Sequence, residues 1–265
     1  MPKALNTLLT HINAALQRQP PSEFQRGLWS HVTARTKLQI AVTIALLICS
    51  GLALDAAWVK TGQWISNACT FVVFAWLLRL GRAPERWTLL ICMALGCFGE
   101  IILSLVWRLY DYQFGNLPLF VPPGHALLML LGVLIAQQLD ALFYPINSLK
   151  SAYLRASTRH SADFFRALWL MGVPIIALIY GCLAWYFAID KFGSALCLVF
   201  LACMLFGRAK TLYVTMFLLA LLMELYGTAL ENWRWAATVP AAIFSPAHVA
   251  EGIVLEVGGD GAGSG

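Results

Sequence analysis

Charged residues are scarce in this chain. Only 12% of its 265 residues are Asp, Glu, Lys or Arg, whereas 60% are hydrophobic, and the mean hydropathy is +0.73. An ordinary soluble domain carries about a quarter charged residues. The shortage of charge and the repeated long apolar runs therefore exclude that class and predict a polytopic integral membrane protein.

The motifs of common soluble enzymes are also absent. The sequence contains no P-loop, no GxGxxG fingerprint and no GxSxG elbow, so ATP hydrolysis, dinucleotide chemistry and α/β-hydrolase chemistry lack support. The seven cysteines fall inside apolar spans and form no CxxC pair, which indicates buried free thiols rather than a disulfide or zinc framework. No cleavable signal peptide is expected, because the first apolar span starts near Leu38 behind a long polar lead.

Eight segments are apolar enough to be predicted as membrane spans, for which a helix needs about 20 mostly apolar residues. The eighth is the weakest, since it contains Pro246, His248 and Glu251. The predicted spans are 38–57, 63–80, 88–107, 122–143, 167–188, 193–207, 211–229 and 241–257.

Lys and Arg are concentrated in alternate loops of this arrangement. With the N-terminus inside, 14 of the 18 Lys and Arg residues lie on the cytoplasmic side. This pattern predicts a multi-pass protein of the cell inner membrane whose N-terminus and C-terminus are both cytoplasmic. The net charge of +5 follows from these loops, so no nucleic-acid partner is expected.

The spans group into two units with shorter segments around them. A basic amphipathic N-terminal segment is predicted either to lie along the inner membrane surface or to dock as a structural helix. The predicted organisation is an N-terminal segment 1–36, a first four-helix unit 37–143, a cytoplasmic connector 144–166, a second four-helix unit 167–257 and a flexible tail 258–265.

The two units repeat one order of residue types. Glu100 lies in the third span and Glu224 in the seventh, and each is followed by aromatic rings, prolines and a histidine. Because each unit has an even number of spans, both keep the same orientation, as in repeats related by an axis along the membrane normal. The predicted fold is all-α, with about eight transmembrane helices in two tandem four-helix parallel repeats.

The two glutamates are the strongest functional candidates. An ionisable residue inside a spanning helix costs a few kcal/mol and marks a functional site by default. A structural alternative is that each carboxylate bonds a neighbouring helix, with the Ser104 hydroxyl as a local partner for Glu100. Two carboxylates in matching places favour a shared polar cavity near the outer membrane face.

His125 and His248 begin the fourth and eighth spans. With Glu100 and Glu224 they form the predicted catalytic set, because Glu and His can act as general acid and base. The same groups suit a divalent metal, for which His125, His248 and Glu251 are the candidate ligands. No HExxH motif is present, and lone histidines at helix starts are more often structural, so the cofactor stays open.

Three prolines precede His125. Pro118, Pro122 and Pro123 break regular structure, which at membrane depth is tolerated only inside protein or around a cavity. The segment before the fourth span is therefore predicted to be a short re-entrant or surface-hugging stretch.

Aromatic and polar side chains alternate after each glutamate. An interfacial aromatic belt explains any one of the rings, but it does not explain the carboxylates and amides between them. Polar groups among aromatic faces line pockets for an extended unsaturated ligand or a lipid head group. The predicted substrate-binding residues are Trp107, Tyr110, Asp111, Tyr112, Asn116, Glu231, Asn232, Trp233 and Trp235.

Two stretches resemble a known group of proteins. "GNLPLFVPPGHALL" and "ELYGTALENWRWAATVPAAIF", within Gly99–Leu128 and Glu224–Phe244, are similar to segments of bacterial membrane proteins grouped with carotenoid biosynthesis. That group includes hydratases that add water to the end of an isoprenoid chain. The resemblance implies an all-helical membrane fold and a hydrophobic, polyene-like substrate. The second proline–histidine segment and the basic N-terminal helix depart from the group.

The sequence thus predicts a membrane-embedded enzyme that acts on a lipid or isoprenoid substrate near the outer membrane face. A proton-coupled transporter or channel is the alternative, because parallel repeats with carboxylates inside the membrane also serve carriers. A third class is a non-catalytic membrane subunit that joins an oligomer or a partner protein through its cytoplasmic loops.

Overall fold

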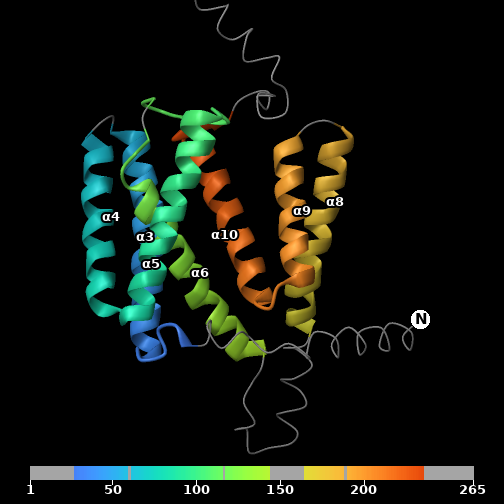
Figure 1. The fold of residues 1–265 in the computed structure, drawn as a ribbon, viewed down its shortest axis with the longest axis horizontal. Helices are drawn as coiled ribbons and strands as arrows, with labels where there is room; N and C mark the ends of the chain where they lie inside the picture. The colour runs from blue at the N-terminus through green and yellow to red at the C-terminus, as the bar shows by residue number, and fades with distance from the viewer. Residues whose placement is uncertain (1–26, 59–60, 116, 144–163, 188–189, 236–265) are drawn as a thin grey trace, which may run out of the picture.

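The computed structural model describes residues 27–58, 61–115, 117–143, 164–187 and 190–235. Within these ranges the chain is mostly helical, with one two-stranded sheet at one end of the helices (Figure 1). The predicted eighth span, the N-terminal segment up to residue 26 and residues 144–163 of the connector lie outside the described residues.

The first unit contains four helices that run alternately in opposite directions. Thr33 begins the first of them, because its side-chain oxygen accepts a hydrogen bond from the Thr36 amide at 3.2 Å. Pro84 stands in the first turn of the third, where its missing N–H would have had no helical partner. These helices are α3 (Ala34–Ala57), α4 (Thr61–Leu80), α5 (Ala83–Glu100) with its π-helical continuation η1 (Ile101–Val106), and α6 (Val121–Phe143).

The second unit contains three described helices. Asp190 caps the middle one, since its Oδ1 accepts a hydrogen bond from the Gly193 amide at 2.7 Å. Figure 1 shows α8 and α9 side by side, with α10 between that pair and α6. The helices are η2 (Leu168–Gly172) continuing into α8 (Val173–Tyr186), α9 (Lys191–Phe206) and α10 (Lys210–Ala229).

Five of the described helices are long and apolar enough to cross a membrane: α3, α5 with η1, α6, η2 with α8, and α10. The helix α9 is apolar but has only 16 residues, and α4 carries buried polar side chains at Ser66, Asn67 and Thr70. Large apolar side chains such as Leu46 and Leu198 are more than 60% exposed. An outer surface of this kind requires a lipid environment, so the chain is a helical integral membrane protein.

Two short strands join the units at one end of the bundle, here termed the strand end. The strand β1 (Tyr110–Tyr112) pairs antiparallel with β2 (Trp233–Trp235). Tyr110 lies opposite Trp235, and Tyr112 lies opposite Trp233. Residues from the two halves of the chain therefore meet directly above the helices.

The chain enters the bundle between β1 and α6. The Phe120 amide donates a hydrogen bond of 2.8 Å to Oδ1 of Asn67, which lies six residues, or about 9 Å, inside α4. Pro118 is fully buried on this path. The helix α6 therefore begins deeper in the bundle than the ends of the neighbouring helices that lie near the strands (Figure 1). Its first turn lies inside the bundle.

The interior below this level is a packed apolar core. Side chains from α3, α4 and α6 fill it, and the best buried of them, each at most 4% exposed, are Ile40, Ile44, Phe74, Leu77, Leu127, Leu130 and Leu134. Close packing of such side chains holds membrane helices together, because lipid tails are as apolar as the side chains themselves.

Two leucines of α6 test this arrangement. Leu134 is 2% exposed and Leu142 is 66% exposed. We expect Leu134→Ala to lower the free energy of unfolding by about 2–4 kcal/mol through the cavity it leaves, and Leu142→Ala to change it by less than about 0.5 kcal/mol. Equilibrium unfolding in mixed detergent micelles measures both. Equal losses would contradict the placement of α6 in the core.

Candidate functional site

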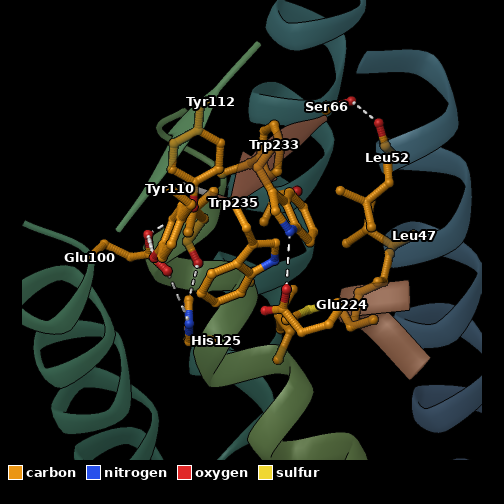
Figure 2. A pocket seen from close by; sticks show the side chains of 18 residues that line it. Leu47, Leu52, Ser66, Glu100, Tyr110, Tyr112, His125, Glu224, Trp233 and Trp235 are labelled. Atoms are coloured by element: carbon orange, nitrogen blue, oxygen red, sulfur yellow. Dashed lines mark hydrogen bonds and ion pairs between the residues drawn. The ribbon is translucent and has the colours of Figure 1, made fainter. Parts of the chain in front are cut away.

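A pocket lies beneath the two strands (Figure 2). Its volume of about 90 Å³ exceeds several-fold the roughly 10–15 Å³ that one water molecule needs. Its walls come from α3, α4, the end of α5, α6 and α10, and the strands cover it. The apolar part of the lining is formed mainly by Leu47, Ile48, Leu52, Phe120, Val121, Leu127 and Met223.

Glu100 forms one wall of the pocket. It is the last residue of α5, directly before the π-helical turn η1, and only 7% of it is exposed. Its Oε2 accepts hydrogen bonds from the hydroxyls of Tyr110 at 2.5 Å and Tyr112 at 2.7 Å. The two tyrosines are two residues apart in β1, so both side chains point to the same face of the strand.

Both phenols are held in their protonated form. Burial, followed by the neighbouring Glu100 carboxylate, raises the pKa of Tyr110 and of Tyr112 well above the usual range. They therefore remain hydrogen-bond donors to Glu100 at every physiological pH.

His125 lies beside Glu100. Its Nδ1 lies 3.0 Å from the Val121 carbonyl oxygen, which can only accept, so Nδ1 carries a hydrogen. Its Nε2 lies 3.4 Å from Oε1 of Glu100. The second ring nitrogen of His125 therefore faces a carboxylate oxygen at the edge of the pocket. An imidazole and a carboxyl group in this arrangement can pass a proton between them.

A glycine makes room for this histidine. A Cβ atom added at Gly96 of α5 would lie only 2.8 Å from Cβ of His125. The helices α5 and α6 can approach closely at this level because Gly96 has no side chain.

Glu224 of α10 lies across the pocket from Glu100, with His125 between them (Figure 2). It is partly buried, and its Oε2 accepts a hydrogen bond from Nε1 of Trp233 at 3.0 Å. The Trp233 ring packs on Gly227, where any added Cβ would collide with it. Each carboxylate is thus held by an aromatic donor from the strand that follows it in the chain.

Seven of the residues predicted from the sequence come together here: Glu100, Glu224, His125, Tyr110, Tyr112, Trp233 and Trp235 all line the pocket. Trp235 completes the ring of aromatic groups, with its ring centre 5.1 Å from that of Tyr110. Segments more than 120 residues apart in the chain therefore form a single site.

Three predicted substrate-binding residues lie outside the lining. Trp107 packs edge-on against Phe192 with ring centres 5.8 Å apart. Asp111 is exposed, because it stands between the two inward-facing tyrosines of β1. Glu231 is exposed and forms an ion pair of 2.8 Å with Arg234. Asp111 and Glu231 therefore belong to the outer surface of the strand end.

Asn232 is also outside the lining, although it is 1% exposed. Its Nδ2 donates to the Leu52 carbonyl oxygen at 3.0 Å and to Oδ2 of Asp55 at 3.1 Å. Its role in the structure is to tie β2 to the end of α3. The remaining predicted residues, Asn116, His248 and Glu251, lie outside the described residues.

The pocket also contains polar groups that the sequence analysis missed. Ser66 and Thr70 line it from α4, and the Ser66 hydroxyl donates to the Gly51 carbonyl oxygen at 2.9 Å. Their spacing of four residues, which puts both on one helix face, was the available signal. Small polar residues are common between membrane helices, so this signal does not separate a site from helix packing.

The described part of the chain contains no group of three or more His, Cys, Asp or Glu side chains placed to hold a metal ion. Of the candidate ligands, His125 contacts Glu100 and Val121, while His248 and Glu251 are not described. A divalent metal at this site stays a prediction.

Comparison of the chain with protein-family models, curated proteins and solved structures gives no match. No relative therefore assigns a role to the pocket, and the resemblance to carotenoid-associated membrane proteins stays a prediction. The geometry of the pocket itself carries the functional argument.

Two glycines of α5 test the contact with His125. A Cβ at Gly96 would overlap His125, whereas a Cβ at Gly99 would have no atom within 4 Å. We expect Gly96→Ala to lower the stability by about 1–3 kcal/mol and Gly99→Ala to leave it unchanged or to raise it by up to about 1 kcal/mol. Melting temperatures of both variants in detergent measure the difference. Identical shifts would contradict the described packing of α5 on α6.

Proposed function

We propose that this protein is a membrane-embedded enzyme that acts on a lipid or isoprenoid substrate by acid–base chemistry in the pocket. The observation that carries the proposal is the contact of His125 Nε2 with Oε1 of Glu100 at 3.4 Å, at the edge of a largely apolar cavity with a second carboxyl group, that of Glu224, across from it. A cavity of this composition suits a hydrocarbon chain with one reactive position.

The geometry supports proton transfer to a carbon–carbon double bond. The Glu100–His125 pair donates its proton to one carbon, the π electrons form the new C–H bond, and the other carbon becomes a cation. The aromatic rings and Glu224 stabilise that cation. Water then adds to it, and its surplus proton passes to Glu224 before it returns to the Glu100–His125 pair. The net reaction is hydration of the double bond, in line with the resemblance to isoprenoid hydratases.

The floor of the pocket favours an enzyme over a transporter or channel. Below the site, Ile44, Phe74, Leu130 and Leu134 pack into the apolar core with hardly any exposed surface. A carrier needs a route to the opposite end of the bundle, and in the described residues this packed layer stands in its path. A pocket closed at the bottom and covered by strands suits a substrate that enters from the bilayer.

We also propose that the chain has two tandem four-helix repeats. In both units a residue with positive φ stands two positions before the strand, Arg108 at 49° and Glu231 at 60°. In both units the carboxylate accepts a hydrogen bond from an aromatic side chain of the strand that follows it in the sequence. The pairing of Tyr110 with Trp235 and of Tyr112 with Trp233 is itself two-fold symmetric. These three likenesses are what an axis along the membrane normal would produce.

One difference in spacing between the repeats has a local explanation. Glu100 precedes the donor Tyr110 by ten residues, whereas Glu224 precedes the donor Trp233 by nine. The first unit contains the π-helical segment η1 at this point, and a π-helical turn holds one residue more than an α-helical turn. The extra residue is absorbed before the strand begins.

The same comparison supports an eighth span. His125 follows Tyr110 by 15 residues, and His248 follows Trp233 by 15 residues. We propose that the segment 241–257 corresponds to α6 and that His248 corresponds to His125.

The distribution of basic residues supports an orientation in the cell inner membrane. Among the described residues, eight Lys and Arg side chains belong to the end opposite the strands and three to the strand end. We propose that the opposite end is cytoplasmic and that the pocket lies near the outer face. The basic residues of the opposite end are Arg35, Lys37, Arg79, Arg82, Arg86, Arg166, Arg208 and Lys210.

Removal of either pocket carboxylate tests the proposed chemistry. Mass spectrometry of lipids that co-purify with the protein first defines the substrate class. We expect Glu100→Gln and Glu224→Gln each to lower turnover of that substrate at least about a hundredfold, because general acid or base catalysis is lost. Glu231→Gln is the matched control, since Glu231 is exposed and outside the pocket. Near-normal turnover in both pocket variants would overturn the proposal.

Reporter fusions test the eight-span arrangement. A cytoplasmic reporter such as green fluorescent protein is expected to fluoresce when fused after residue 265, and alkaline phosphatase at the same place is expected to be inactive. The reverse result is expected for fusions after Gly115, which follows β1 at the strand end. An active phosphatase at the C-terminus would indicate an odd number of spans and would contradict the repeat.

A further inference from the structure

The described lining of the pocket has more acidic than basic side chains. Its carboxyl groups are those of Glu100 and Glu224, and its basic side chain is the imidazole of His125, which contacts Glu100. The indole of Trp233, which donates a hydrogen bond to Glu224, is neutral. No Lys or Arg is among the described residues that line the pocket. Within the described part of the chain, Glu224 forms no ion pair with a basic side chain.

The basic residues nearest in the sequence do not supply that partner. Arg234 is exposed and forms its ion pair with Glu231 at 2.8 Å. Arg108 is exposed at the end of η1 and does not line the pocket. A carboxylate partly withdrawn from water is costly unless a positive charge approaches it. The carboxyl group of Glu224 is therefore open to a cationic ligand in the cavity.

The surroundings of Glu224 fit an organic cation better than a metal ion. Five aromatic rings line the cavity, those of Tyr110, Tyr112, Phe120, Trp233 and Trp235. Aromatic faces attract alkylated ammonium groups, which are weakly hydrated, whereas metal ions need several oxygen or nitrogen ligands. The other walls are mostly apolar, so they suit a hydrocarbon chain.

We propose that the pocket recognises a positively charged organic group carried on a hydrocarbon chain, with Glu224 as its counter-ion and the aromatic rings around it. The inference rests on the site of the proposed function and names the chemistry of its ligand. Such a charge has two sources: the cation that forms when an isoprenoid double bond is protonated, or a permanent ammonium group on an amphiphile.

Binding of matched ligands tests the inference without knowledge of the substrate. Octyltrimethylammonium and its uncharged carbon isostere, 2,2-dimethyldecane, have the same shape and differ in one charge. In dodecyl maltoside micelles, we expect the ammonium compound to bind at least about tenfold more tightly, as measured by isothermal titration calorimetry and quenching of tryptophan fluorescence. Octyl sulfate, with the opposite charge, is expected not to compete.

Variants assign the preference to the pocket. We expect Glu224→Gln to remove most of the tenfold preference, Trp235→Leu to weaken it more than Trp235→Phe does, and Glu231→Gln to leave it unchanged. Melting temperatures confirm that each variant is folded. Equal affinity of the wild-type protein for the charged and uncharged ligands would overturn the inference without use of any variant. An unchanged preference in a folded Glu224→Gln protein would also overturn it.

Separate measurements distinguish the two sources of charge and keep the two proposals apart. Inhibition of isoprenoid turnover by octyltrimethylammonium indicates a cation formed in the reaction. Conversion or uptake of the ammonium compound itself in proteoliposomes indicates a permanent cation as substrate or cargo. If the ammonium compound binds as expected but no isoprenoid is turned over, this inference stands and the proposed hydration fails. Turnover of an isoprenoid without any preference for the charged ligand would support the hydration and overturn this inference.

Discussion

The pairing of β1 with β2 is the contact on which the pocket depends. Only three residues on each side take part, yet they come from opposite halves of the chain and place four aromatic side chains over one cavity. The tyrosines of β1 reach Glu100, and Trp233 of β2 reaches Glu224. Without the pairing, each carboxylate would keep its own donors, but the two would not share a pocket.

Hydrogen bonds from nearby aromatic side chains stabilise each carboxyl group inside the bundle. The hydroxyls of Tyr110 and Tyr112 donate to Glu100, which His125 also contacts, and the indole N–H of Trp233 donates to Glu224. Glycines complete the arrangement, because Gly96 admits His125 and Gly227 admits the ring of Trp233. The donors lower the cost of burial and also fix where the carboxylate oxygens point. The same hydrogen bonds therefore stabilise the buried carboxyl groups and hold them in the orientation that the proposed chemistry needs.

Much of the fold was predictable because apolar length is a strong signal in membrane proteins. The seven described helices begin and end within a few residues of their predicted spans, and the largest differences are at helix starts such as Ala83 and Ala34. Predicted residues on regular elements, Glu100, Glu224 and His125, came together in the pocket. Asp111 and Asn232 did not, because a strand alternates its side chains between two faces and a corner residue can point anywhere.

The sequence by itself determined the class of protein, the helices, and the types of side chain that gather after each glutamate, because hydropathy and local order are properties of short segments. Only the tertiary structure decided which of those side chains face one another. The depth at which α6 begins, the register of β1 on β2 and the contact of His125 with Glu100 depend on interactions between distant segments. The same contacts place Glu224 across the cavity from Glu100, where the described lining contains no Lys or Arg.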